Sequence, residues 1–255
     1  MRKVTLAGMV TAVIAGAAGA ATMLSTGSGP ASAVADGADA GPAQFPYAVK
    51  ITATDIPKPD GSTYDSACSA SLISPEWIVT AGHCFHDVDK NPVSGPPQYK
   101  TTATIGASDL SSPKAVTVDV VDVRQSSVND IALAKLSKPV TGVKTLQLAT
   151  KPPKKGDQLT LAGWGATNET HPVPSTQLRY GKVDVSSTTD TTVLVHGSWP
   201  HPDMSACTYD SGAPYFSGNT LVSVESTGPG CPHTGDETTS RVDIQTDWIK
   251  QEIGG

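Results

Sequence analysis

The octapeptide Cys207-Thr208-Tyr209-Asp210-Ser211-Gly212-Ala213-Pro214 places a serine between an aspartate and a glycine, in a turn that a proline closes. Such a turn holds the serine hydroxyl in a loop rich in backbone N–H groups, which can point at a developing negative charge. The same residue types are also common in ordinary turns, because each of them favours turn conformations. The octapeptide therefore indicates catalysis only if the rest of the chain supplies a base and an orienting acid.

Two further segments carry the groups that nucleophilic acyl transfer needs besides a hydroxyl, namely a base and a carboxylate that orients it. His83 follows a β-branched stretch that ends at Thr80, and Asp130 stands at the head of an apolar stretch. Each has an ordinary interpretation as well, since histidines are often packed and hydrogen-bonded and aspartates often start turns. His83 precedes Cys84 and Ser211 follows Cys207 closely, so both candidate groups lie beside residues able to form disulfides.

The composition limits the classes of fold and function. The 255 residues hold 24 glycines and 20 prolines, only 5% are aromatic, and the formal net charge is -6. Abundant glycine, proline, valine and threonine predict an all-β protein of short strands joined by turns. The acidic balance argues against a nucleic-acid-binding protein.

The N-terminus has the features of an export signal. Arg2 and Lys3 precede an apolar run from Val4 to Leu24, and a small-residue cleavage site follows at 31–33. We expect residues 1–33 to be a signal peptide and the protein to be secreted, with no membrane attachment afterwards. An uncleaved membrane anchor is the alternative, because the run is nearly long enough to span a bilayer, although its small residues make it weakly apolar. Export favours two disulfides for the four cysteines over a metal site, with three pairings possible.

Four segments together resemble the signature blocks of the trypsin/chymotrypsin-like serine proteases, and they occur in that family's order of His, Asp and Ser. They are Thr80-Ala81-Gly82-His83-Cys84, Asp130-Ile131-Ala132-Leu133, Gly163-Trp164-Gly165 and the octapeptide above. The resemblance implies two packed antiparallel six-stranded β-barrels within 34–255, at about 34–138 and about 156–241. The apolar spacing of 242–253 predicts a C-terminal α-helix.

The resemblance also implies roles for individual residues. His83 would be the general base, Asp130 its orienting partner and Ser211 the nucleophile, while the N–H groups of Tyr209 and Ser211 would form the oxyanion hole. Tyr209 stands where the family usually has glycine, which predicts backbone strain there. The implied disulfides are Cys68–Cys84 and Cys207–Cys231.

Substrate contacts are implied in the same way. Ser226 and Gly228 would pair with the substrate backbone, and Thr227 replaces a tryptophan that usually walls the site. Ser205 and Ala206 would form an uncharged pocket floor that suits an apolar or aromatic side chain. We interpret Asp236 and Glu237 as solvated loop acids; the alternative is that one of them projects into the pocket and pairs with arginine or lysine.

In this family a new apolar N-terminus pairs with the aspartate before the nucleophile, which corresponds to Asp210. Counting back along the chain makes Val34 that terminus. Because Val34 directly follows the expected signal-peptide cleavage site, our hypothesis is that signal peptidase itself releases the activating terminus.

No cofactor and no catalytic metal are expected. His83 and His86 have no nearby Cys or acid cluster that would complete a metal site. We interpret the other histidines as surface or loop residues, namely His171, His196, His201 and His233. A structural Ca²⁺ ion bound to an acidic loop is the alternative left by the sequence. The resemblance implies a monomeric secreted serine endopeptidase acting on protein or peptide substrates, with protein inhibitors as further possible partners. The alternative is a protease homologue that serves as a binding protein because Tyr209 blocks the oxyanion hole. A lipase or esterase of another fold would need the Gly-x-Ser-x-Gly motif, which is missing here.

Overall fold

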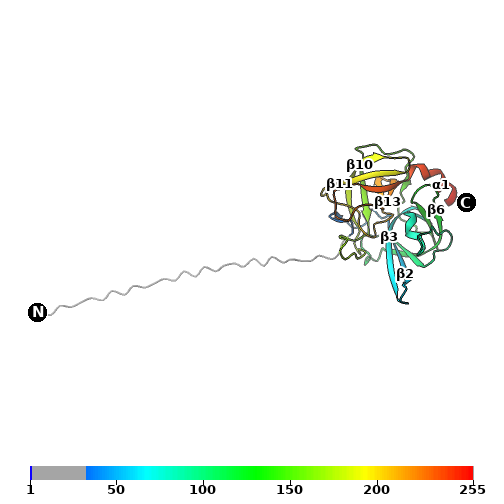
Figure 1. Ribbon diagram of the computed structural model, residues 1–255, viewed down its shortest axis with the longest axis horizontal. Coiled ribbons are helices and arrows are strands. Elements are labelled where there is room, and N and C mark those ends of the chain that lie inside the picture. Colours follow the sequence, from blue (N-terminus) through cyan, green and yellow to red (C-terminus); the bar gives the residue numbers. More distant parts are fainter. Residues whose placement is uncertain (2–32, 255) are drawn as a thin grey trace.

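The computed structural model describes Met1 and residues 33–254, so the expected signal peptide lies outside the described residues except for its two ends. The described part of the chain consists of strands, short 3₁₀ turns and one α-helix at its C-terminal end (Figure 1). The strands close into two six-stranded antiparallel barrels, which confirms the expected all-β fold.

The first barrel is closed by antiparallel pairing between its first strand, β2, and its fourth strand along the chain, β5. Its ring order is β2-β3-β4-β7-β6-β5, and Ile51 lies opposite Ala103 where β2 meets β5. The six strands are β2 (Ala48–Pro57), β3 (Thr63–Ser74), β4 (Trp77–Thr80), β5 (Lys100–Ile105), β6 (Val116–Gln125) and β7 (Ala132–Leu136).

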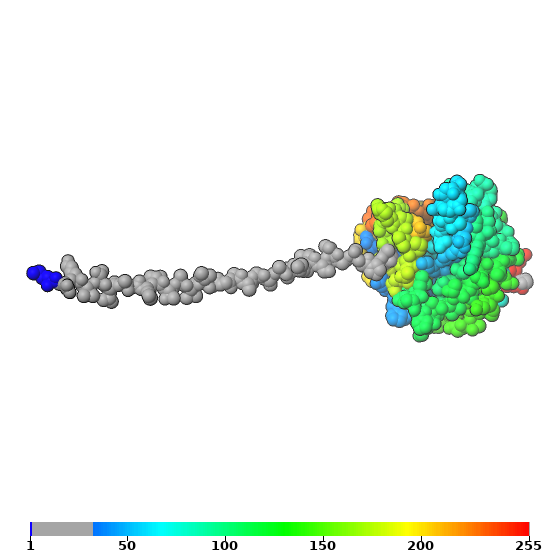
Figure 2. Space-filling model, turned by 90° about the horizontal axis from the view of Figure 1, so that it is seen from below, coloured from blue at the N-terminus to red at the C-terminus, as the bar shows by residue number. Residues whose placement is uncertain are grey.

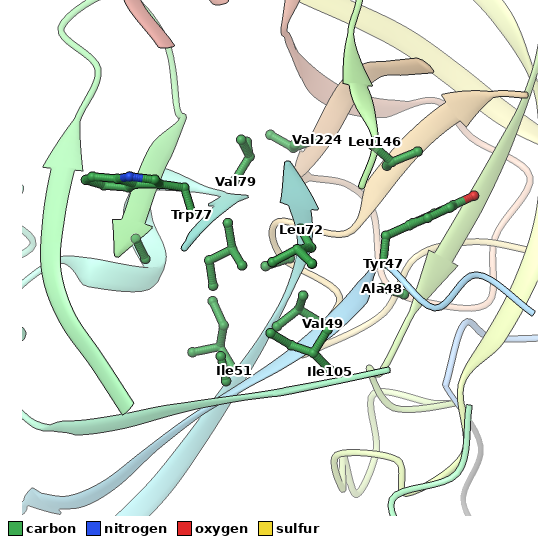
Figure 3. Close-up of a cluster of buried hydrophobic side chains, with 14 of the residues drawn as sticks. Tyr47, Ala48, Val49, Ile51, Leu72, Trp77, Val79, Ile105, Leu146 and Val224 are labelled. Carbon is green, nitrogen blue, oxygen red and sulfur yellow. The ribbon is translucent and has the colours of Figure 1, made fainter. Parts of the chain in front are cut away.

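Alternating burial along these strands produces the barrel interior. On β6 the side chains of Val118, Val120 and Val123 are buried while their neighbours are exposed or half-buried. Figure 3 shows side chains from several strands gathered in one cluster, in which Val224 comes from the second barrel. The core of the first barrel thus continues across the boundary and holds the two barrels together.

The second barrel closes in the ring β9-β10-β11-β14-β13-β12, with β12 returning to β9. Its strands are β9 (Gln158–Gly163), β10 (Arg179–Thr188), β11 (Thr192–Trp199), β12 (Pro214–Ser217), β13 (Thr220–Thr227) and β14 (Glu237–Arg241). Two short strands attach to its outside: β1 (Ala38–Asp39) pairs with β10 and β8 (Gln147–Leu148) with β13. We expected the first barrel to begin near residue 34, but its first strand begins at Ala48, because the preceding segment pairs with the second barrel.

The C-terminal helix α1 (Thr246–Ile253) is shorter than the expected 242–253, since a 3₁₀ turn over Asp243–Gln245 precedes it. Ile249 is fully buried and anchors the helix on the core. The helix lies at the edge of the barrels, away from the β2–β3 hairpin, which extends beyond the rest of the molecule (Figure 1). Figure 2 shows this hairpin, in cyan, as a raised ridge on the surface.

We expect Leu133→Ala to lower the free energy of unfolding by about 2–5 kcal/mol, because Leu133 is fully buried on β7 and its truncation leaves a cavity. The control is Val121→Ala on the neighbouring strand β6, where the side chain is 43% exposed and the loss should stay below about 1 kcal/mol. Urea-induced unfolding measures both. Equal losses would contradict the assignment of Leu133 to the core.

Candidate active site

His83 lies in a 3₁₀ turn over Gly82–Phe85 that follows β4. The preceding glycine is required by packing, because a Cβ at Gly82 would meet the side-chain oxygens of Gln125 and Asp130 at 2.8 and 3.0 Å. The disulfide Cys68–Cys84 ties this turn to β3. Local sequence and covalent bonding therefore hold the imidazole in one place.

Asp130, just before β7, binds His83 twice. Its Oδ2 lies 2.7 Å from His83 Nδ1, and its Oδ1 accepts the backbone N–H of His83 at 2.8 Å. The hydroxyl of Ser226 on β13 also donates to Oδ2, at 2.7 Å. Burial opposes ionisation, but the hydrogen bonds from His83 and Ser226 and the charge of His83 outweigh it and lower the pKa of Asp130. A carboxylate held in this way orients the imidazole, leaving Nε2 free for chemistry.

Ser226 therefore has a role that sequence reasoning missed. We expected it only to contact the substrate backbone, whereas its hydroxyl binds the carboxylate that holds His83. No local motif signals this contact, because Ser226 and Asp130 lie in different barrels.

Ser211 lies in the loop before β12, and its carbonyl accepts the N–H of Ser69 at 2.9 Å. The next residue must be glycine, because Gly212 has a φ of 81° and a Cβ there would collide with the backbone of Ser69. Ser211 and His83 line the same pocket of about 350 Å³, which the β2–β3 hairpin borders. Among the described residues, no hydrogen bond joins their side chains.

The backbone around Ser211 leaves two N–H groups free. The N–H groups of Asp210, Gly212 and Ala213 all donate to backbone carbonyls, whereas those of Tyr209 and Ser211 donate to none of the described residues. Tyr209 has a φ of 77°, a conformation that glycine adopts easily and that costs another residue about 1–2 kcal/mol. The tyrosine thus takes the backbone shape of the glycine it replaces, and its N–H stays available.

A second pocket of about 170 Å³ opens beside Ser211, and Cys207, which forms a disulfide with Cys231, lines it. Four of the residues predicted to bind substrate line it, namely Ala206, Ser226, Thr227 and Gly228. Ser205 does not line it. Its buried hydroxyl accepts the backbone N–H of His233 at 3.3 Å.

The interpretation of Glu237 as a solvated loop acid is wrong. Glu237 is only 3% exposed, and its Oε1 accepts the N–H of Ala206 at 2.9 Å and lies 3.0 Å from His233 Nε2. Asp236 does face solvent and binds the Ser186 hydroxyl at 2.5 Å. Glu237 begins β14, and consecutive strand residues point to opposite sides, so the two acids separate. His233, interpreted as a surface or loop residue, does lie in the loop before β14, but its side chain is only 10% exposed because it packs against Glu237.

Asp210, the expected partner of the N-terminus, is fully buried. It accepts the N–H groups of Gly165 at 2.8 Å, Cys207 at 3.1 Å and Val34. Burial raises the pKa of Asp210 to about 7 against the pull of these donors. In the intact chain, Val34 therefore brings a neutral amide to this carboxyl group, which forms no ion pair with any residue in the described part of the chain.

Arg179 at the start of β10 holds the segment after Val34, and sequence reasoning missed it. Its guanidinium donates to the carbonyls of Val34, at 3.3 Å, and Gly37, and its Nε lies 3.1 Å from the Asp39 carboxylate. A single arginine at a strand end carries no local signal for such a role.

Among the described residues, no group of three His, Cys, Asp or Glu side chains lies close enough to hold a metal ion. Within 33–254, no helix is long and apolar enough to cross a bilayer.

A family model described as Trypsin matches residues 34–249. The chain belongs to the trypsin family. Trypsin alpha-4 of Lucilia cuprina is 31% identical over 185 residues, which cover 65% of this chain and 69% of that protein. Hypodermin-B of Hypoderma lineatum is 29% identical over 204 residues, which cover 72% and 77%.

Solved structures share the trypsin fold with this chain. Neuropsin, titled a serine protease of mouse brain, has a TM-score of 0.69 at 21% identity and covers 86% of this chain and 100% of its own. Human heparin binding protein has the same TM-score and identity, with coverage of 87% and 97%. At these identities the likeness establishes the fold alone.

We expect Ser226→Ala to lower kcat/KM roughly ten- to a hundredfold, because it removes a hydrogen bond to a charged group worth about 1.5–3 kcal/mol. The acid limb of the pH profile should move to higher pH, because Asp130 loses one of the hydrogen bonds that lower its pKa. Ser223→Ala is the control, because that buried hydroxyl on the same strand binds Thr239 instead. A profile that moves equally in both variants would contradict the role of Ser226.

We expect the form of this protein that begins at Val34 to be more stable than a form that begins two residues earlier. The difference between their Tm values should grow from about pH 4 to about pH 7. In the longer chain, Asp210 has a pKa raised above its unfolded value, so stability present at low pH is lost as the pH rises. In the shorter chain, the new ammonium offsets that loss. Asp210→Asn should abolish the pH-dependent part, and a difference that is constant with pH would argue against this pairing.

Proposed function

We propose that this protein is a secreted serine endopeptidase that cleaves peptide bonds with His83, Asp130 and Ser211. The observation that carries the proposal is the geometry around His83. Two hydrogen bonds join His83 to Asp130, and His83 lines the same pocket as Ser211 and Tyr209, whose backbone N–H groups donate to none of the described residues. The trypsin-family relationship supports the same conclusion.

The reaction begins when Ser211 Oγ attacks the substrate carbonyl carbon and His83 Nε2 accepts the hydroxyl proton. Asp130 holds Nδ1 and stabilises the imidazolium. The N–H groups of Tyr209 and Ser211 bind the oxyanion. His83 then gives the proton to the leaving amine, and an acyl-enzyme forms; water, activated by His83, hydrolyses the ester and restores Ser211.

The mature protein is proposed to begin at Val34, after cleavage by signal peptidase during export. The secreted protein is proposed to act as a monomer on protein or peptide substrates. Support comes from the burial of Val34 and from the contact of its N–H with Asp210. N-terminal sequencing of the secreted protein tests this proposal, and a start far from Val34 would contradict it.

The second candidate function is that of a binding protein that has kept the fold. Fold alone does not separate the two functions, because both a titled serine protease and a titled heparin binding protein share it. The conformation of Tyr209 favours catalysis, since the backbone donor is in place despite the side chain.

Labelling of the secreted protein with a fluorophosphonate probe decides between the two. The probe needs an activated serine and a working oxyanion hole, so we expect labelling of the wild type and none of Ser211→Ala or His83→Ala. The control is Ser217→Ala, whose side chain is exposed on β12. Folded wild-type protein that resists labelling would support the binding protein instead.

A further inference from the structure

Tyr209 has a backbone conformation that favours glycine, and it carries one of the two N–H groups proposed to bind the oxyanion. Its φ of 77° lies in the left-handed region, which a side chain makes unfavourable. A tyrosine in this conformation can relieve the strain by rotating one of its two flanking peptide bonds. The direction of the Tyr209 N–H relative to Ser211 therefore depends on both peptide bonds being fixed.

Hydrogen bonds from other parts of the chain hold each of these peptide bonds. In the preceding one, the Thr208 carbonyl accepts the N–H of Ala166 at 2.7 Å. In the following one, the Tyr209 carbonyl accepts the hydroxyl of Ser69 at 3.3 Å, and the N–H donates to a carbonyl within the same loop. Ala166 and Ser69 thus hold Tyr209 from outside its loop.

The side chain of Ser69 joins the two segments that supply these bonds. Ser69 lies on β3 of the first barrel and has no exposed surface. Its hydroxyl donates to Tyr209 and also accepts the N–H of Trp164 at 3.0 Å, two residues before Ala166. Removal of this one hydroxyl therefore breaks the bond to Tyr209 and loosens the segment that holds the preceding peptide bond.

The backbone of Ser69 is itself fixed beside the loop. Its N–H donates to the Ser211 carbonyl at 2.9 Å, and its carbonyl accepts the hydroxyl of Thr80 at 2.8 Å. The residue before it, Cys68, forms the disulfide with Cys84. The hydroxyl thus projects from a braced strand, which suits it to hold a strained residue of the other barrel.

We propose that Ser69 is a positioning residue for the oxyanion hole. Its hydroxyl holds Tyr209 in the conformation of glycine and thereby keeps the Tyr209 N–H directed at the carbonyl oxygen of a bound substrate. The proposal rests on the proposed endopeptidase function and adds the residue that compensates for a tyrosine at a glycine position.

The first test measures inactivation by an alkyl fluorophosphonate, which requires no knowledge of the substrate, and separates kinact from KI. In Ser69→Ala we expect kinact to fall roughly ten- to a hundredfold, because an oxyanion donor is worth about 10²–10³ in rate and is turned away in most molecules. KI should stay within about threefold of wild type, since Ser69 lines neither pocket beside Ser211.

Ser71→Ala is the matched control. Ser71 lies on the same strand, is equally buried, and its hydroxyl has no hydrogen-bond partner among the described residues. Its removal should leave kinact within about threefold of wild type. Equal losses in the two variants would indicate a general effect on β3 and would overturn the proposal.

Tyr209→Gly supplies a readout that a merely structural role of Ser69 would not change. Glycine adopts a φ of 77° without strain, so it does not need the bond from Ser69. In the Tyr209→Gly background, Ser69→Ala should lower kinact by less than about threefold, so the second substitution rescues the first. Losses of equal size in the two backgrounds would contradict the proposal.

Tyr209→Gly alone tests the proposal without any variant of Ser69, and so it remains informative if Ser69→Ala fails to fold. Because the tyrosine is already held in the shape of glycine, kinact should rise by no more than about threefold. A rise of about tenfold or more would show that the tyrosine is not held in this way.

A crystal structure of Ser69→Ala separates this inference from the proposed function, because the conformation of Tyr209 can be seen without any catalysis. We expect Tyr209 to leave the left-handed region in this variant and its N–H to turn away from the pocket. A φ that stays near 77° would overturn the proposal, even if the probe labels the wild type. A wild type that resists labelling, with Tyr209 turned in the variant, would overturn the endopeptidase function and support the role of Ser69.

Discussion

The carboxylate of Asp210 has no exposed surface, and three separate parts of the chain direct backbone N–H groups at it. Val34 comes from the N-terminal segment, Gly165 from the loop just after β9, and Cys207 from the loop that carries Ser211. A Cβ at Gly165 would collide with the carboxylate, so the glycine allows this close approach. A buried carboxyl group is stable only when its oxygens accept hydrogen bonds. The burial of Asp210 therefore requires these three segments to meet. The loop of Ser211 is shaped by the same requirement.

The candidate site depends equally on the contact between the barrels. His83 and Asp130 come from the first barrel, while Ser211 and Ser226 come from the second. The hydroxyl of Ser226 crosses this boundary to Asp130, and the core cluster that includes Val224 continues across it close by. Apolar packing between the barrels thus fixes the distance between the polar side chains that each barrel contributes to the site. The second barrel also contains three buried acids, Asp210, Glu225 and Glu237, and burial raises the pKa of each of them.

Much of the fold was predictable because its strands alternate apolar and polar residues or follow clear turns. β14 was not, since Glu237-Thr238-Thr239-Ser240-Arg241 has no apolar residue and is buried only through its neighbours β11 and β13. β5 is similarly polar, and only Ala103 and Ile105 in it are apolar, so its alternation is too brief to predict a strand. The helix was predicted too long at its start, because periodicity does not distinguish an α-helix from the 3₁₀ turn before it.

The fold class, the order of the His, Asp and Ser motifs and the family could all be derived from the amino-acid sequence alone, because they follow from local composition and from short motifs of neighbouring residues. Three contacts became visible only in the folded chain: Ser226 binds Asp130, Arg179 holds the segment after Val34, and Glu237 is buried beside Ala206 while Asp236 faces solvent. Each of these contacts joins residues distant in sequence or depends on which side of a strand faces inward. A shift of one residue in register would exchange Asp236 and Glu237, and strand pairing across the whole barrel sets that register.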